Sequence, residues 1–90
     1  MQELSQTDRP LRRAEAHIVL KCRPGEEETI IEHLRKTEGV KEIQRTIGEF
    51  DVLVKMEAED SDSLRRIIRW KVVRNENVLS VVTLMCMRNS

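Results

Sequence analysis

The sequence predicts an α+β protein whose elements follow the order β-α-β-β-α-β. Four runs have the two-residue alternation or the β-branched composition of strands, and two segments carry an apolar stripe at helical spacing. Turn and capping residues separate these segments. Because crossover connections are right-handed, this order predicts the ferredoxin-like plait, a four-stranded antiparallel sheet with both helices on one face.

The first strand is predicted over residues 16–22. The run AHIVLKC is rich in β-branched and aliphatic residues, and it stops just before Pro24. Residues 1–15 are polar, contain Pro10 and show no sustained period, which indicates a flexible N-terminal arm. We therefore expect a single domain over residues 16–88.

The first helix is predicted over residues 26–39. Three glutamates begin this segment, where the positive end of the helix dipole favours acidic side chains, and Gly39 is expected to end it. Its apolar stripe consists of Ile30, Ile31, Leu34 and Thr37.

A hairpin is predicted from two alternating runs, residues 40–47 and residues 51–58. The apolar positions of the two runs are Ile43, Ile47, Val52, Val54 and Met56. The connection between the runs carries a glycine, an aromatic residue and a carboxylate together, whereas a hairpin turn requires only the glycine.

The second helix is predicted within residues 59–77. Its candidate N-cap residues are Asp60, Ser61 and Asp62. The positions at helical spacing are Leu64, Ile67, Ile68, Lys71 and Val72, and arginines collect toward the end of the segment, where the helix dipole favours them.

The last strand is predicted over residues 78–87 and is apolar on both sides. One set of side chains is Val78, Val82, Leu84 and Cys86, and the other is Leu79, Val81, Met85 and Met87. Since both helices cover the same face of the sheet, one set must lie on the uncovered face. A second copy packed sheet against sheet would cover that face, so we expect a homodimer.

The charge balance and hydropathy exclude several classes of partner. Sixteen basic and sixteen acidic side chains cancel, so no overall field attracts nucleic acid or a membrane surface. No apolar run approaches the roughly 18 residues that span a bilayer, and the N-terminus lacks the apolar core of a signal peptide. These features predict a cytoplasmic protein without membrane contact.

Neither the cysteines nor the methionines predict a metal or redox site. Cys22 and Cys86 lie in no CxxC pair, would be too far apart in this fold for a disulfide, and are expected to be buried reduced thiols. Met85 and Met87 neighbour Cys86, but strand alternation sends Cys86 to the opposite face, which favours core packing over copper. We expect no metal and no cofactor.

The second helix carries a basic group and the single tryptophan. The basic residues are Arg65, Arg66, Arg69, Lys71 and Arg74. With little aromatic interleaving, they favour a solvated helix face over a phosphate-binding patch, and we predict no sequence-specific DNA binding. Trp70 lies at the edge of the apolar stripe, so it marks either a contact between dimers or a ring lying partly buried along the surface.

The opening strand AHIVLKC, the segment EGVKEIQRTIGEFD and the closing run NVLSVVTLMCM together resemble the effector-binding (RAM) domain of the Lrp/AsnC, or leucine-responsive regulator, family. The resemblance covers residues 16–87 and rests on a G-x-aromatic-D element between two predicted strands. It implies a dimer through the sheet faces, often assembled into tetramers or octamers, that binds a small amino acid or related metabolite between subunits.

The same resemblance implies ligand-binding residues at Gly48, Glu49, Phe50, Asp51 and Thr83. Gly48 would let the backbone approach the ligand and leave N–H groups free for a carboxylate, and Asp51 would hold an ammonium group. Phe50 would form a wall of the pocket. The alternative is a plain hairpin turn in which Asp51 caps the backbone locally.

Full-length members of the family carry an N-terminal helix-turn-helix domain, whereas only fifteen polar residues precede Ala16 here. We therefore expect a stand-alone effector domain that modulates transcription through oligomerisation or through association with full-length Lrp/AsnC regulators. A ligand-independent oligomerisation adaptor and an AsnC-like enzyme subunit are the alternatives. The enzyme is disfavoured because the sequence offers no nucleophile–base pair and no carboxylate dyad on one face.

Overall fold

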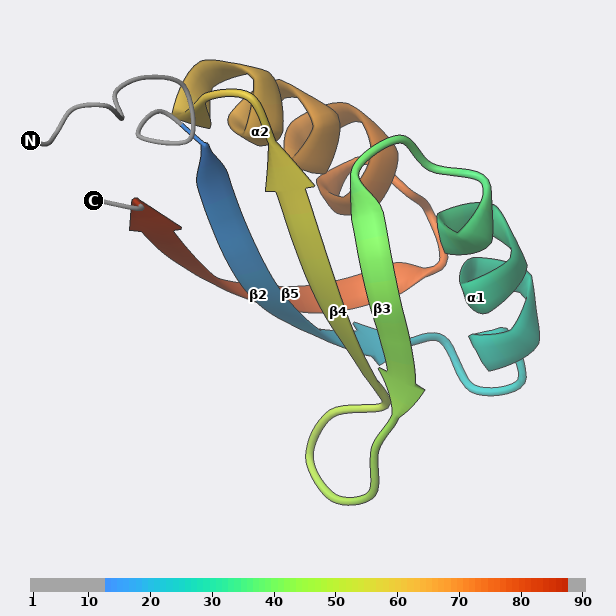
Figure 1. Ribbon diagram of the computed structural model, residues 1–90. Helices are drawn as coiled ribbons and strands as arrows, with labels where there is room; N and C mark the ends of the chain where they lie inside the picture. Colours follow the sequence, from blue (N-terminus) through green and yellow to red (C-terminus); the bar gives the residue numbers. More distant parts are fainter. Residues whose placement is uncertain (1–12, 88–90) are drawn as a thin grey trace, which may run out of the picture.

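The computed structural model describes residues 13–87. This part of the chain contains four strands and two helices (Figure 1). Their order confirms the predicted β-α-β-β-α-β arrangement. The elements are β2 (Ala14–Cys22), α1 (Glu27–Arg35), β3 (Val40–Arg45), β4 (Val52–Ala58), α2 (Ser61–Ile67) with its π-helical continuation η2 (Ile68–Val73), and β5 (Val78–Met87).

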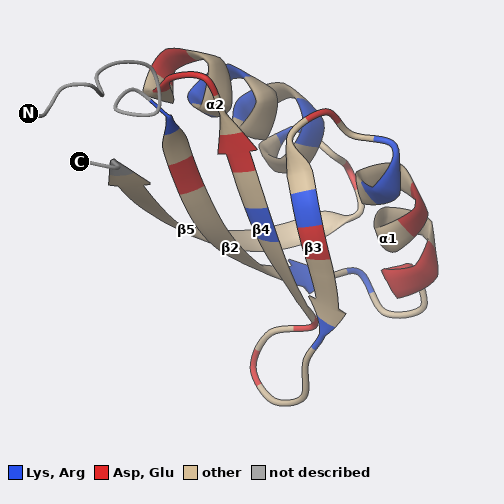
Figure 2. Ribbon diagram, in the orientation of Figure 1, with Lys and Arg blue, Asp and Glu red and all other residues tan. Residues whose placement is uncertain are grey.

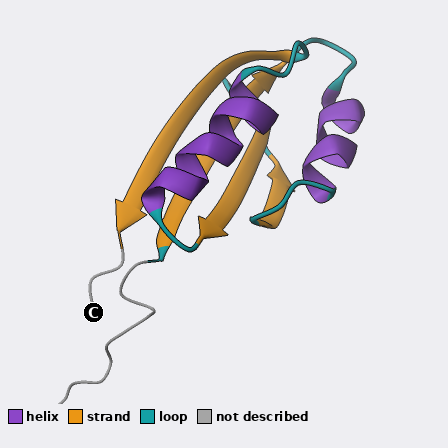
Figure 3. Cartoon of the chain, turned by 90° about the horizontal axis from the view of Figure 1, so that it is seen from above, coloured by secondary structure: helices purple, strands orange, loops and turns teal. Residues whose placement is uncertain are grey.

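The four strands form one antiparallel sheet in the order β3-β4-β2-β5. The first and last strands are thus neighbours, as the plait requires. Both helices lie on the same face of the sheet (Figure 3). The ferredoxin-like fold predicted from the sequence is therefore confirmed.

The core lies between the sheet and the helices. Along β2, every second side chain points into it, because successive side chains of a strand face opposite sides. The buried residues of β2 are Ala14, Ala16, Ile18, Leu20 and Cys22. They pack with Val52, Val54 and Met56 of β4 and with Ile30, Ile31, Leu34, Leu64, Ile68 and Val72 of the helical segments.

The start of β2 and the end of α1 differ from those predicted. Strand β2 begins at Ala14 rather than at residue 16, because Ala14 is fully buried and pairs with Ala58 of β4. The predicted arm before Arg13 lies outside the described residues. Helix α1 ends at Arg35 rather than Gly39; Thr37 lies beyond it, yet stays buried and donates a hydrogen bond from Oγ1 to the carbonyl oxygen of His33 (2.9 Å).

Asp60 is the N-cap of α2. Its Oδ1 accepts a hydrogen bond from the backbone N–H of Ser63 (2.8 Å), and this bond holds the pKa of the carboxyl group below its usual value. The inward positions of the second helical segment are Leu64, Ile68 and Val72, with Ile67 half-buried. Lys71 is exposed, so the predicted apolar stripe is correct except at that position.

The two faces of β5 are now distinguished. Val81 and Met85 pack against the core. Val82, Leu84 and Cys86 lie on the opposite face of the sheet, which the helices leave uncovered and which we call the helix-free face. A register shift between Lys21 and Cys22 of β2 turns Val78 toward the core, although simple alternation groups it with Val82. The side chain of Met87 lies outside the described part.

The two cysteines are free and lie at opposite ends of the β2–β5 pair, as predicted. Cys22 is opposite Val78 and is buried, whereas Cys86 is opposite Glu15 and is exposed. The expectation that both thiols are buried is therefore wrong for Cys86, because it points to the face that the helices leave uncovered.

The helix-free face carries an apolar row across three strands. Val19 of β2 lies between Leu53 of β4 and Val82 of β5, and the next row places His17 between Lys55 and Leu84. Val82 and Leu84 are 51% and 63% exposed. The apolar row thus runs from Leu53 through Val19 to β5, and the polar side chains His17, Glu42, Gln44 and Lys55 lie beside it toward β3 and β4.

Candidate functional site

The connection between β3 and β4, residues 46–51, is a loop that extends beyond the sheet (Figure 1). Strand β3 ends at Arg45, two residues earlier than predicted, and Ile47 is fully exposed rather than inward. Thr46 closes the loop: its N–H donates to the carbonyl oxygen of Asp51 (2.9 Å), and its Oγ1 donates to that of Phe50 (2.8 Å). We call this segment the 46–51 loop.

Gly48 occupies a backbone conformation that other residues rarely adopt, with φ = +120°. A Cβ atom added there would meet no atom within 4 Å, so the glycine is required by the backbone conformation and not by close packing. Among the described residues, the N–H groups of Gly48, Glu49 and Phe50 donate no hydrogen bond. The turn therefore presents consecutive free amides to its surroundings.

Asp51 fixes the 46–51 loop to the end of β2. Its Oδ2 accepts a hydrogen bond from the backbone N–H of Cys22 (2.7 Å), and its own N–H donates to the carbonyl oxygen of Leu20 (2.8 Å). The other carboxyl oxygen, Oδ1, accepts no hydrogen bond from the part of the chain described. The carboxylate is thus held by a residue 29 positions away, and it keeps one oxygen available.

The thiol next to Asp51 is held in its neutral form. Burial raises the pKa of Cys22, and the negative charge of Asp51 raises it further. Because a thiolate is the reactive form of cysteine, this thiol is unsuited to nucleophilic chemistry.

Four of the five predicted site residues lie together, and the fifth lies apart. Phe50 and Asp51 are half-buried, and Glu49 is exposed with its carbonyl oxygen accepting a hydrogen bond from Lys21 Nζ (3.4 Å). Thr83 is opposite Ile18 on β5, on the far side of β2 from the loop. Within one chain, Thr83 therefore lies apart from Gly48–Asp51.

Sequence reasoning missed the residues that support the loop. Thr46, Leu20 and the backbone N–H of Cys22 position Asp51, and the pairing of β2 with β4 brings them together. Backbone donors and acceptors cannot be recognised from a sequence, because every residue type except proline supplies both.

The titratable side chains do not gather into a metal or catalytic centre within residues 13–87. No group of three His, Cys, Asp or Glu side chains lies close enough there to hold a metal ion. His33 donates from Nε2 to the carbonyl oxygen of Lys71 (2.9 Å), which ties α1 to η2. None of the described helices has the length and apolar character needed to cross a membrane.

Comparison with known proteins identifies relatives of the whole domain. The model of the family described as Lrp/AsnC ligand binding domain matches residues 15–90. Homocitrate synthase from Saccharolobus solfataricus is 33% identical over 81 residues; that match takes in 89% of this chain, which spans 17% of the enzyme's length.

Solved structures share the fold. A hypothetical protein from Pyrococcus horikoshii superposes with a TM-score of 0.80 at 25% identity, over 84% of this chain and 92% of that one. A transcriptional regulator from Neisseria meningitidis, crystallised in complex with L-Met, gives a TM-score of 0.76 at 15% identity, over 98% of this chain and 60% of the regulator.

Proposed function

Since this chain belongs to the Lrp/AsnC ligand-binding domain family, we propose that it binds an amino acid or related small metabolite at the 46–51 loop. Binding occurs at a subunit interface, and it modulates transcription through oligomerisation or through association with full-length regulators of the family. The protein acts in the cytoplasm as an effector sensor.

The arrangement around Asp51 is the observation that carries this proposal. An α-amino acid presents an ammonium and a carboxylate a few ångströms apart. The available Oδ1 of Asp51 suits the ammonium, because charge-assisted hydrogen bonds are the stronger class. The free amides of Gly48, Glu49 and Phe50 suit the carboxylate, since successive N–H groups in a turn form an anion-binding concavity.

A second copy of the chain completes this site. Thr83 is separated from its own 46–51 loop by β2 and, between Val82 and Leu84, points to the helix side of the sheet, so a pocket that uses both has the loop of one protomer beside the edge strand β5 of another. The apolar row on the helix-free face supports such an association, because the contact removes Val19, Val82 and Leu84 from water. A contact of this kind is isologous and yields a closed dimer, from which larger oligomers assemble.

The relatives support an amino acid as the class of ligand. The regulator from N. meningitidis shares the fold and was crystallised with L-Met. Amino acids of different side chains fit the same ammonium and carboxylate contacts, and half-buried Phe50 is the apolar wall that discriminates among them.

The homocitrate synthases favour a second candidate function. A stretch of each of those enzymes is similar to this chain, so the domain accompanies biosynthetic catalysis as well as transcription. In this second candidate function, the chain binds the same class of effector but regulates an enzyme instead of transcription. In neither candidate does the chain itself catalyse a reaction: the neutral Cys22 thiol and the backbone contact of His33 support this view.

A thermal-shift panel of the amino acids tests the proposed function. A ligand at about 100 times its dissociation constant adds about 2.7 kcal/mol of stability, which is several degrees for a domain of this size. We expect one or a few amino acids to raise the melting temperature of the wild type. Asp51→Asn is the informative variant, because its amide oxygen still accepts from the Cys22 N–H while the charge that holds the ammonium is gone.

Glu38→Gln is the matched control, since it removes an exposed carboxylate away from the 46–51 loop. We expect the shift to persist in Glu38→Gln and to disappear in Asp51→Asn. A thermal shift of equal size in both variants would show that the Asp51 carboxylate does not contribute to ligand binding. No shift for any amino acid in the wild type would overturn the effector proposal and favour the ligand-independent adaptor.

A further inference from the structure

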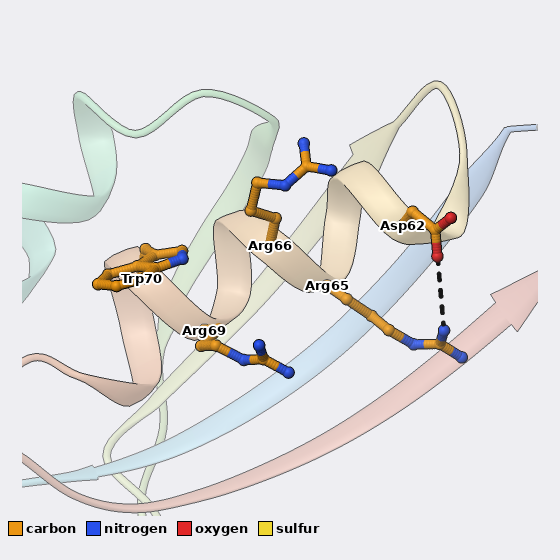
Figure 4. Close-up of a pocket in the computed structure, with 5 residues that line it drawn as sticks. All are labelled: Asp62, Arg65, Arg66, Arg69 and Trp70. Atoms are coloured by element: carbon orange, nitrogen blue, oxygen red, sulfur yellow. Dashed lines mark ion pairs between the residues drawn. The ribbon is translucent and has the colours of Figure 1, made fainter.

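The outer side of α2 and η2 carries an open groove of about 360 Å³ that the proposed effector site does not use. It is lined by Asp62, Arg65, Arg66, Arg69 and Trp70. Figure 4 shows these side chains projecting from the helix, with Trp70 one turn along from Arg66. With Val73, which is also exposed, these arginines and Trp70 form what we call the Arg–Trp face.

The arginines of this face have only loose acidic partners. Arg65 forms an exposed ion pair with Asp62 at 3.8 Å, a distance too long for a hydrogen bond, and the charge of Arg66 acts on Asp60 without a hydrogen bond between them. The side chain of Arg69 makes no ion pair or hydrogen bond to any described residue. Two arginines elsewhere are held more closely: Arg13 lies 2.9 Å from Glu57 and Arg45 lies 2.6 Å from Glu28. Basic positions also run along α2 in Figure 2, in a chain whose net charge is zero.

The face also exposes apolar surface beside these charges. Trp70 is 55% exposed and Val73 is 52% exposed. The guanidinium of Arg74 lies 4.3 Å from the centre of the Trp70 ring, and this cation–π contact holds the indole in place. Both readings of Trp70 offered by the sequence, a contact between dimers and a ring lying partly buried along the surface, agree with this exposure.

A π-helical segment gives the face its shape. The N–H of Arg74 donates to the carbonyl oxygen of Arg69, five residues back (3.1 Å), so the helix is wider here than an α-helix. Ile68 and Val72 still pack inward, and the wider turn carries Arg69, Trp70 and Val73 outward. Single π turns inside helices occur frequently at functional sites.

We infer that the Arg–Trp face is a docking surface for an acidic, partly apolar segment of a partner protein. Arginine and tryptophan are the residues most enriched where protein interfaces concentrate their binding energy. Arg65 and Arg69 stand about one helical turn apart, roughly 6 Å, which suits two carboxylates of a peptide. This use of the face is separate from the effector site and goes beyond the proposed function.

The same observations disfavour a nucleic acid on this face. Glu59, Asp60 and Asp62 at the start of α2 would repel a phosphate backbone that runs along the whole helix, whereas a short acidic segment can place its few carboxylates near Arg69, away from these acids. The zero net charge adds no long-range attraction to DNA. The exposed Val73 is suited to an apolar side chain of a protein segment.

Trp70 is the only tryptophan in the sequence, so the intrinsic tryptophan fluorescence of the protein reports on binding at the Arg–Trp face. The experiment titrates the protein with a blocked acidic peptide that carries two leucines among its glutamates, and it follows Trp70 fluorescence. The controls are the same peptide with glutamine in place of glutamate, and a short DNA duplex. The test variant is Arg66→Gln with Arg69→Gln, and the matched variant is Lys36→Gln with Lys41→Gln, which removes equal charge from exposed positions elsewhere.

We expect the acidic peptide, and not its glutamine analogue, to shift the emission of the wild type. The apparent dissociation constant should rise by roughly tenfold or more in Arg66→Gln/Arg69→Gln, because hydrogen bonds to charged groups are lost. It should stay unchanged in Lys36→Gln/Lys41→Gln. No shift with the acidic peptide, equal affinity in both variants, or tighter binding of the DNA duplex would each overturn the inference.

Discussion

Replacing Gly39 by alanine is expected to lower the free energy of unfolding by at least about 3 kcal/mol. Gly39 has φ = +89°, where an L-residue costs about 1–2 kcal/mol. Its added Cβ would also lie 2.8 Å from the carbonyl oxygen of Glu57, and backbone atoms cannot move aside as a flexible side chain can. The contact is fixed by a hydrogen bond from the N–H of Glu57 to the carbonyl oxygen of Gly39 (2.8 Å).

Gly25→Ala separates the two causes. Gly25 has nearly the same φ, +84°, but its added Cβ would meet no atom within 4 Å. Urea unfolding at one protein concentration should therefore give a loss of about 1 kcal/mol for Gly25→Ala and a much larger one for Gly39→Ala. Equal losses would mean that the turn after α1 does not pack against the end of β4 as described.

Replacing Leu84 by glutamate is expected to convert a dimer into a monomer. Leu84 is 63% exposed on the helix-free face, beside His17. In an isologous contact the substitution acts twice, and each copy loses about 1.5–3 kcal/mol of apolar burial. The dissociation constant should therefore rise by at least about a hundredfold, which sedimentation velocity over a dilution series can measure.

Val73→Glu is the control for this change. Val73 has similar exposure, 52%, but it lies on η2, in the helical layer, so its substitution should leave the dimer intact. A wild-type protein that sediments as a monomer at all concentrations would contradict the sheet-to-sheet dimer. Dissociation caused by Val73→Glu and not by Leu84→Glu would move the interface to the helical layer.

The sequence was sufficient to predict the order of elements, because the patterns that specify them are local. Alternation in β2 and the spacing of Ile30, Ile31 and Leu34 each reflect one buried face. The ends of elements were harder to predict. Ile47 continues the apolar alternation of β3, but the chain leaves the sheet at Arg45 to form the 46–51 loop.

The candidate site was predictable only in part, for a related reason. The resemblance indicated Gly48–Asp51, and the structure places these consecutive residues in the loop between β3 and β4. The contact between Asp51 and the backbone of Cys22 joins residues 29 positions apart, and it depends on the pairing of β2 with β4. The position of Thr83 relative to the loop follows from strand order, which a local motif does not encode.

The most direct test of the effector site is to map ligand binding on the backbone amides by NMR. The amino acid with the largest thermal shift is added to the labelled protein, and every amide resonance is followed. We expect the largest changes at Gly48, Phe50 and Asp51, with a second group of changes around Thr83. Changes confined to the Arg–Trp face, or no changes at saturating ligand, would contradict an effector site at the 46–51 loop.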